Sequence, residues 1–415
     1  MKNYDVLVVG AGPAGLLAAG RAAELGGKVL LLEKMNTPGR KLLITGKGRC
    51  NITNNAGISE FIQHVKPDGR FLRNAFSQFY SEDILNLLQK YGVEVTLERG
   101  GRYFPTGNKA KDVLDALLKW VKELKVEIRC GQKVQKLLIE NNQIQGLLVN
   151  GQKILSKQVI LAIGGKSYPA TGSNGEGFAL AKAAGHSVEK LMPALVPVIT
   201  EGNIAQKLQG LALKNVRATV WVNSKKAGDD FGEMLFTHYG LSGPIILTLS
   251  RLMVTEIEKG NSVELSIDLK PALDEQKLDK RLIRDLNEQG KKKIGNIFRG
   301  LLPASMIPVF LEILKLDPQK EGHQITSKER KQIRNLLKNM RFNIRGHRSF
   351  KEAIITAGGV STKEIVPKTM ESKLISGLYF AGEMINLDAE TGGYNLQIAF
   401  STGWLAGNSC KNQLT

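Results

Sequence analysis

A glycine-rich turn between two short apolar runs most constrains what this chain can fold into. Residues 4–9 (YDVLVV) are largely apolar and lead directly into residues 10–15 (GAGPAG), a G-x-G-x-x-G turn. A helical pattern follows, and a second apolar run over 28–32 ends in Glu33. A strand, a glycine turn, a helix, a strand and an acid in this order are typical of a βαβ unit that binds a dinucleotide.

Each residue of this turn has a physical role in that interpretation. Gly10 permits a tight turn, Gly12 lets a pyrophosphate approach the backbone, and Gly15 allows the helix to pack closely on the strand. The first N–H groups of the helix attract phosphate, and Glu33 would accept hydrogen bonds from ribose hydroxyls. The residues expected to bind the ADP half of the dinucleotide are Gly10, Gly12, Pro13, Ala14, Gly15, Glu33 and Lys34.

A basic, glycine-rich segment follows the second strand. Residues 37–58 are rich in glycine, asparagine and threonine, and they predict an extended loop at the carboxyl edge of the sheet, where such folds bind ligands. Its cations and amides suit a pyrophosphate and a polar ring edge, and a mobile basic surface loop is the alternative. The residues expected at the cofactor are Arg40, Lys41, Thr45, Gly48, Arg49, Cys50 and Asn51.

Two further strand-like runs end in glycine. Residues 158–165 (QVILAIGG) and 378–383 (LYFAGE) are apolar until their last residues. A strand that ends in glycine lets a cofactor approach the backbone, and an acid at that point can bind ribityl or ribose hydroxyls. The contacts expected here are Ala162, Gly164, Gly165, Gly382 and Glu383.

A glycine pair opens the predicted last helix. Residues 391–397 (TGGYNLQ) precede a largely apolar helical stretch that extends to Ser409. The N-terminus of this helix would face the pyrimidine edge of a flavin, where its dipole stabilises negative charge on the reduced ring. The flavin contacts expected here are Gly392, Gly393, Tyr394, Asn395 and Leu396.

Length and composition bound the class of protein. A chain of 415 residues is long enough for two or three domains, and no run approaches the roughly 18–20 apolar residues of a membrane span. Met1–Asn3 leads straight into the first strand, so we expect no signal peptide. The three widely spaced cysteines predict neither a disulfide framework nor a metal site, and they favour a cytoplasmic location.

The pattern along the chain predicts one nucleotide-binding domain with an insertion. Strand and helix patterns alternate over residues 1–192 and return over 345–415, so these two segments are expected to form a discontinuous cofactor domain. The inserted domain is expected over 193–344, with a β-rich part at 193–270 and a helical, basic part at 271–344.

Positive charge is concentrated in one segment. The formal net charge is +19, and residues 277–351 hold 19 Lys or Arg against 7 Asp or Glu. Such a surface could attract RNA, an anionic membrane or an acidic partner. Because the segment lacks interleaved aromatic residues for base stacking, a solvated helical surface is the favoured interpretation and RNA is the alternative.

The whole pattern resembles the flavoproteins with two dinucleotide-binding domains, and more narrowly the BaiN/RdsA-type NAD(P)/FAD-dependent oxidoreductases, which include aminoacetone-oxidase-like members. The stretches that carry the resemblance are 39–54, 164–177, 235–244, 357–360 and 382–397.

That resemblance implies an α/β fold in which a Rossmann-like, glutathione-reductase-like FAD-binding domain is interrupted by an inserted β-barrel plus helical domain that covers the flavin. It also implies that Val134 lies beside the adenine. The chain departs from the family at Asn386, where an Asp is common, and the departure removes a charge near the flavin.

Function is expected to be hydride transfer through flavin N5 between a small organic substrate and either oxygen or a transiently bound NAD(P)H. An amine such as aminoacetone is one candidate substrate. The alternatives are a flavoprotein that acts on RNA through residues 277–351, and a non-enzymatic electron-transfer or sensor protein. Candidate catalytic groups are His238, Tyr239 and Cys50, and orienting a loop is the alternative for His238. Neighbouring cations could lower the pKa of Cys50, but a structural or flavin-contacting cysteine is favoured over a nucleophile.

Overall fold

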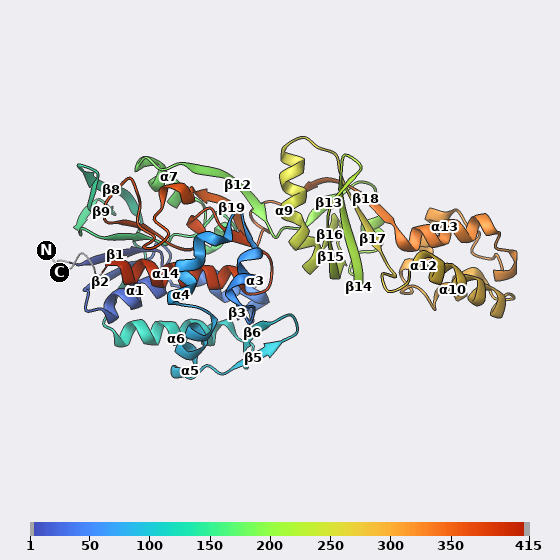
Figure 1. Ribbon diagram of the computed structural model, residues 1–415, viewed down its shortest axis with the longest axis horizontal. Helices are drawn as coiled ribbons and strands as arrows, with labels where there is room; N and C mark the ends of the chain where they lie inside the picture. Colours follow the sequence, from blue (N-terminus) through green and yellow to red (C-terminus); the bar gives the residue numbers. More distant parts are fainter. Residues whose placement is uncertain (1–3, 411–415) are drawn as a thin grey trace. The chain divides into compact units, whose positions relative to one another are not determined.

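The computed structural model describes residues 4–410, and its contacts divide the chain into two units. Unit 1 comprises Met1–Pro193 and Ala353–Thr415, and unit 2 comprises Ala194–Glu352. Unit 1 is thus built from two segments that are distant in the sequence, and Figure 1 shows its first and last helices side by side.

A five-stranded parallel sheet forms the centre of unit 1. Its order is β20 (Leu378–Phe380), β11 (Val159–Leu161), β1 (Val6–Val9), β2 (Val29–Leu32) and β7 (Glu127–Arg129). Strands β1, β2, β11 and β20 are buried throughout, as expected for a sheet that helices cover on both faces. The Rossmann-like fold class predicted from the sequence is confirmed.

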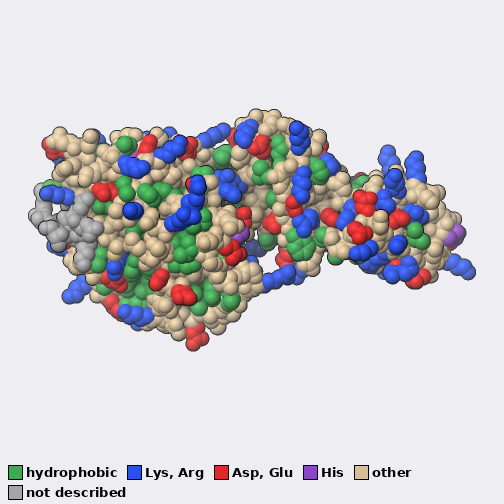
Figure 2. All heavy atoms as spheres, in the orientation of Figure 1, with side chains coloured by type: hydrophobic (Ala, Val, Ile, Leu, Met, Phe, Trp, Pro, Cys, Tyr) green, Lys and Arg blue, Asp and Glu red, His purple; other side chains and the backbone are tan. Residues whose placement is uncertain are grey.

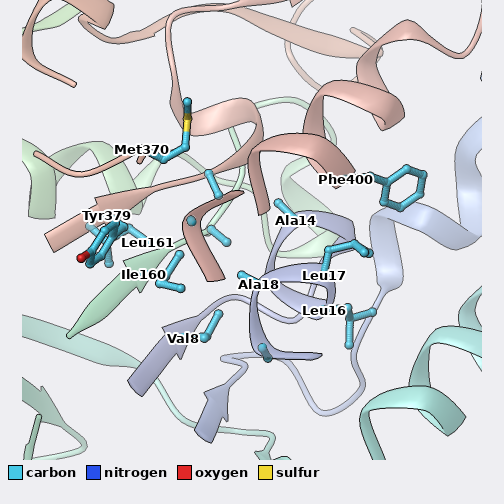
Figure 3. Packing of buried hydrophobic residues seen from close by; sticks show 14 of the residues in the cluster. Val8, Ala14, Leu16, Leu17, Ala18, Ile160, Leu161, Met370, Tyr379 and Phe400 are labelled. Atoms are coloured by element: carbon cyan, nitrogen blue, oxygen red, sulfur yellow. The ribbon is translucent and has the colours of Figure 1, made fainter. Parts of the chain in front are cut away.

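The first and last helices of unit 1 pack backbone against backbone. A Cβ on Gly403 of α14 (Tyr394–Ser409) would collide with the carbonyl oxygen of Ala14 in α1 (Pro13–Glu24), and one on Gly407 would collide with that of Ala18. Figure 3 shows Ala14 and Ala18 beside the strand residues Val8 and Ile160, with Phe400 of α14 nearby.

Smaller elements surround this sheet. Three two-stranded or three-stranded sheets are formed by β3 (Thr53–Asn54), β5 (Val95–Glu98) and β6 (Arg102–Pro105), by β4 (Val65–Lys66) and β21 (Asp388–Ala389), and by β12 (Val188–Ala194) and β19 (Ile355–Val360). A meander joins β8 (Val134–Glu140), β9 (Gln143–Val149) and β10 (Gln152–Leu155). The remaining helices are α2 (Arg40–Ile44), α3 (Ile58–Gln63), α4 (Arg73–Gln78), α5 (Ser81–Lys90), α6 (Ala110–Glu123) and α7 (Glu176–Ala183).

Unit 2 contains a closed six-stranded barrel. The strands are β13 (Val198–Thr200), β16 (Gly240–Ser242), β15 (Lys225–Phe236), β14 (Ala212–Val222), β17 (Val263–Asp268) and β18 (Met340–His347), and β18 pairs with β13 to close the ring. Alternate residues of β14 and β17 are buried, which gives the barrel its apolar interior. Two helices, α8 (Ile204–Lys207) and α9 (Pro244–Glu258), accompany the strands.

A helical part lies between β17 and β18. It consists of α10 (Glu275–Glu288), α11 (Ile294–Phe298), α12 (Met306–Leu314) and α13 (Ser327–Lys338). Asp274 caps α10 by accepting a hydrogen bond from the Lys277 N–H at 2.7 Å, and Thr326 with Glu329 forms a capping box on α13. Buried leucines on α10 belong to an apolar core that this part shares with the barrel.

Two expectations need correction. The segment 37–58 is not one extended loop, because α2 begins at Arg40 immediately after Gly39, whose φ of +68° ends the preceding turn. The second contact boundary between the units lies at 352–353, beyond the expected position at 344–345. The physical reason is that β18, which runs to His347, is needed to close the barrel.

Candidate cofactor site

The three glycines of the first turn are required for different reasons. Gly10 has a φ of +100°, and a Cβ there would lie 2.5 Å from the carbonyl oxygen of Ala162, while a Cβ on Gly15 would collide with the carbonyl of Gly10. At Gly12 φ is an ordinary −83° and no protein atom lies within 4 Å of an added Cβ. Packing explains Gly10 and Gly15, whereas the open space at Gly12 fits a ligand that approaches the backbone.

Glu33 holds the turn from the end of β2. Its carboxylate oxygens accept hydrogen bonds from the backbone N–H groups of Ala11 and Met35, each at 2.9 Å. Each carboxylate oxygen has a second lone pair that could accept a ribose hydroxyl. Glu33 therefore shapes the turn and keeps acceptor capacity for the adenosine side of a dinucleotide.

A lysine and a half-buried acid join two distant segments at the carboxyl edge of the sheet. Lys41 Nζ lies 2.5 Å from Glu383 Oε2 and donates to Ser167 Oγ at 2.6 Å. Glu383 Oε1 also accepts hydrogen bonds from Ser167 Oγ at 2.9 Å and from the Thr356 N–H at 2.8 Å.

Burial by itself raises the pKa of the Glu383 carboxyl. The charge of Lys41 and the hydrogen bonds from its neighbours outweigh burial, so the pKa of Glu383 lies below its ordinary value. Gly165 is required beside this carboxylate, because a Cβ there would lie 2.7 Å from Glu383 Oε1. The network is therefore ionised and closely packed at neutral pH.

A hydrogen-bond acceptor without a partner in the described chain, Asn51 Oδ1, lies beside the N-terminus of α14. Gly393 caps the helix with φ +94°, and a Cβ there would lie 2.9 Å from Asn51 Oδ1. Asn51 Oδ1 is buried and has no hydrogen-bond partner among the described residues 4–410. A flavin pyrimidine edge offers an N–H donor between two carbonyl acceptors, which fits this buried acceptor next to the free N–H groups of the first helical turn.

The side chains of Tyr394 and Asn395 are already engaged in the protein. Asn395 Oδ1 accepts from the Ala389 N–H at 2.9 Å, and its Nδ2 donates to the Ala389 carbonyl at 2.8 Å. The Tyr394 ring stacks on His64 with centroids 4.6 Å apart. A contact of these two residues with the isoalloxazine stays a prediction, and it would use their backbone N–H groups rather than the Asn395 amide.

Several predicted contacts make other interactions. Lys34 Nζ donates to Asn174 Oδ1 at 2.8 Å and pairs with Glu176 at 3.2 Å. Arg49 pairs with Glu98, and its guanidinium lies 4.2 Å above the Phe104 ring. Val134 and Leu396 are partly buried against the core of unit 1. Their roles at a cofactor stay predictions.

Cys50 does not have the properties of a nucleophile. It is fully buried at φ +61°, and burial raises the pKa of its thiol to about 12. The expectation that neighbouring cations lower this pKa is wrong, because Arg49 turns to Glu98 and Phe104 and the thiol is removed from water. Cys50 is a packed residue of the loop, with its N–H donating to the Thr45 carbonyl at 3.0 Å.

His238 and Tyr239 lie in unit 2, between β15 and β16. His238 is exposed and its ring meets that of Tyr239 edge-on at 4.7 Å. Tyr239 donates to Glu352 Oε2 at 3.3 Å and lies under the Arg348 guanidinium, 4.5 Å away. Burial raises the pKa of Tyr239. A catalytic role for either residue stays a prediction.

Some residues of the site were missed from the sequence. Ser167 lies just after the pair Gly164–Gly165, and Thr356 lies just before the pair Gly358–Gly359. Their positions beside glycine pairs could have indicated polar groups at the sheet edge. His64 and Glu390 are hydrogen-bonded at 2.7 Å although 326 residues separate them, and no local pattern could have paired them.

Four segments therefore meet at one edge of a parallel sheet. Ala162 abuts Gly10, Ala14 lies beside Gly382, Glu383 holds Lys41, and Gly393 lies beside Asn51. A dinucleotide turn at one end and a helix N-terminus with an unsatisfied acceptor at the other define a flavoprotein of the FAD-binding Rossmann class.

Comparison with known families confirms this class. The family model described as HI0933-like protein Rossmann domain matches residues 4–409, and the chain belongs to that family. This is the BaiN/RdsA-type family of FAD-dependent oxidoreductases that the sequence motifs resemble.

Two relatives align over nearly the whole chain. A 3-dehydro-bile acid delta(4,6)-reductase of Clostridium scindens is 30% identical over 406 residues, covering 97% of this chain and 98% of its own length. A ribosomal RNA dihydrouridine synthase of Escherichia coli is 29% identical over 405 residues, covering 97% of each chain. Among solved structures, a 3-ketosteroid-delta4-(5alpha)-dehydrogenase of Rhodococcus jostii RHA1 has a TM-score of 0.49 and 16% identity, covering 99% of this chain and 97% of that one.

Within residues 4–410, none of the helices combines the length and apolar character needed to cross a bilayer. The same residues contain no group of three His, Cys, Asp or Glu side chains placed to hold a metal ion.

Proposed function

We propose that this protein is a reductase that uses FAD and NAD(P)H to saturate a carbon–carbon double bond conjugated with a carbonyl, and that its substrate is a uridine of ribosomal RNA. The names of both full-length relatives describe the saturation of a double bond. Dihydrouridine is uridine with its C5=C6 bond reduced, and that bond is conjugated with the C4 carbonyl. The reaction adds one hydride and one proton to the ring.

The observation that carries the choice of RNA is the charge of the helical part of unit 2. Figure 2 shows Lys and Arg side chains over the surface of this part, with acidic side chains among them. The exposed cations without an ion pair in the described structure include Lys280, Lys291, Lys292, Lys293, Arg299, Lys315, Lys328 and Lys331. Cations dispersed over several helices suit a polyanion better than a small carboxylate.

The residues of unit 1 supply binding and orientation. When bound, FAD accepts a hydride from a nicotinamide and passes it to the substrate at N5. The glycine turn would admit the pyrophosphate, and the Lys41–Glu383 pair joins the two segments at the sheet edge where the cofactor would bind. The N-terminus of α14, with Gly393 as its cap, stabilises negative charge beside it.

A small conjugated enone is the second candidate substrate. The bile acid reductase is the relative with 30% identity, and a 3-oxo-4,6-diene would present the same conjugated double bond as uridine. Oxidation of aminoacetone with oxygen as the electron acceptor remains a prediction. The use of NAD(P)H as the electron donor is also a prediction, and the names of the two relatives mention neither compound.

An anaerobic assay separates these substrates. The yellow holoenzyme is reduced with NADH or NADPH and mixed with ribosomal RNA from cells that lack the protein, or with a 3-oxo-4,6-diene bile acid. The oxidised enzyme is mixed separately with aminoacetone. Flavin reoxidation by RNA together with dihydrouridine in the digested nucleosides supports the proposal. Reoxidation by the diene alone would move the substrate to the second candidate, and bleaching by aminoacetone alone would overturn the reductase assignment.

A further inference from the structure

A histidine packs against the N-terminus of α14, and the predicted cofactor contacts assign it no role. His64 follows α3 directly and precedes β4, which pairs with β21 so that Lys66 lies opposite Asp388. His64 Nδ1 lies 2.7 Å from Glu390 Oε2, and its ring stacks on Tyr394, the first residue of α14. The side chains of His64 and Glu390 are 30% and 37% exposed, so the pair is open to solvent.

The same few residues connect this histidine to the predicted flavin edge. Glu390 is followed by the turn 391–393, and the carbonyl of Gly392 accepts a hydrogen bond from Asn54 Nδ2 at 2.9 Å. Gly393, the cap of the helix, lies against Thr53 and the unsatisfied Asn51. His64 therefore borders the helix terminus toward which the reduced ring would direct its negative charge.

We propose that His64, oriented by Glu390 and by stacking on Tyr394, is the acid that protonates the substrate carbon next to the one that receives the hydride. This inference rests on the proposed reductase function. With Nδ1 engaged by Glu390, the exchangeable proton is on Nε2, for which the described residues 4–410 provide no hydrogen-bond partner. In the step, hydride adds to one carbon of the double bond, the Nε2 proton adds to the other, and water reprotonates the imidazole. The NAD(P)H of the proposed function is the source of the hydride and its electron pair, so charge and electrons balance.

The surroundings of the ring support this acid role. The hydrogen bond to Glu390 raises the pKa of His64, burial opposes the shift, the charges of Glu390 and Glu60 add to it, and Lys66 opposes it. The Tyr394 hydroxyl, whose own pKa burial raises to about 12, is neutral at physiological pH and adds no charge. A histidine whose pKa is moved upward toward neutrality is suited to donate a proton at physiological pH.

The test divides the reaction into its two halves. His64→Gln is expected to retain its flavin and its rate of flavin reduction by NAD(P)H, and to be reoxidised by ferricyanide at the wild-type rate, since ferricyanide requires no proton on carbon. Reoxidation by the conjugated substrate should fall by about 10²–10⁴-fold. Gln63→Ala, which removes the exposed neighbouring side chain, serves as the matched control and should behave as wild type.

Glu390→Gln gives a second readout that does not depend on the His64 variant. Losing the carboxylate lowers the pKa of His64, so the alkaline limb of the substrate-reduction profile should move to lower pH. A wild type that reduces no conjugated double bond would overturn the proposed function and remove this step with it. If the wild type is active and His64→Gln reduces the substrate at the same rate at every pH, the role of His64 is overturned while the proposed function stands. The same conclusion follows if the alkaline limb of the Glu390→Gln profile lies at the wild-type pH.

Discussion

Lys41 Nζ and Glu383 Oε2 lie 2.5 Å apart although 342 residues separate them in the sequence. Lys41 belongs to α2, which follows β2, and Glu383 follows β20 at the far edge of the parallel sheet. The pair therefore connects the two segments of unit 1 at the carboxyl ends of its strands. Both side chains are 20% exposed, so the ion pair is partly shielded from water, and removing one partner leaves the other charge partly buried without its counter-ion.

Removing this charge is expected to weaken both the fold and the cofactor site. Glu383→Gln leaves Lys41 partly buried without its carboxylate and should lower stability by about 1–3 kcal/mol, together with a loss of bound FAD. Thermal unfolding and the flavin-to-protein absorbance ratio measure the two effects. The matched control is Glu312→Gln, which breaks the exposed Lys207–Glu312 pair in unit 2 and should change stability by less than about 1 kcal/mol.

The same pair predicts an acid dependence of stability. Because the pKa of Glu383 is lower in the folded protein than its ordinary value of 4.5, the carboxylate stabilises the fold at neutral pH. That contribution decreases as the pH falls below about 4.5 and is lost below the folded pKa. Wild type should therefore lose more stability than Glu383→Gln between neutral and acidic pH in chemical denaturation. Parallel pH profiles for the two proteins would contradict this.

Gly12 is expected to be required by the ligand and not by the fold. A valine at Gly12 has an ordinary backbone conformation and free space, so Gly12→Val should contain no FAD and unfold at the temperature of flavin-free wild type. Gly57→Val is the matched control, because Gly57 also has an ordinary φ of −65° with no atom near an added Cβ. Gly57→Val should stay yellow. Normal flavin content in Gly12→Val would refute the assignment of this turn to the pyrophosphate.

The cysteines should react in an order set by burial. Cys50 and Cys410 are buried, and burial raises the pKa of both thiols, that of Cys50 to about 12. Cys130 is half-buried, so an alkylating reagent applied to the native protein should modify Cys130 first. Cys50 and Cys410 should react only after unfolding, as peptide mass spectrometry would show. Fast native labelling of Cys50 would restore it as a candidate nucleophile.

Binding to RNA should depend steeply on salt and on the helical part of unit 2. Lys291, Lys292 and Lys293 are consecutive exposed cations immediately before α11. Reversing all three to Glu should weaken binding to ribosomal RNA and reduce the slope of log K against log salt by about 3, if each contacts one phosphate. Flavin content and reduction by NAD(P)H should not change, because these residues belong to unit 2. Identical salt slopes for the two proteins would argue against this surface.

The sequence by itself determined the cofactor class and the elements that carry it. The order of strand, glycine turn, helix, strand and acid identified the βαβ unit, because each residue in it answers a local requirement of backbone conformation or packing. The β-rich and helical parts of the insertion could be predicted for the same reason, since hydrophobic periodicity is local. The extent of the insertion could not, because β18 belongs to the barrel through its pairing with β13, which lies far away in the sequence.

Only the tertiary structure decided which side chains act together. It showed that Cys50 is buried with a raised pKa, that Arg49 is engaged by Glu98, and that Glu383 is held by Lys41. It also brought His64 to Glu390, a pair for which the sequence offers no signal. Charge, burial and pKa depend on neighbours that the fold supplies from hundreds of residues away, whereas a turn or a helix cap depends on the few residues that form it.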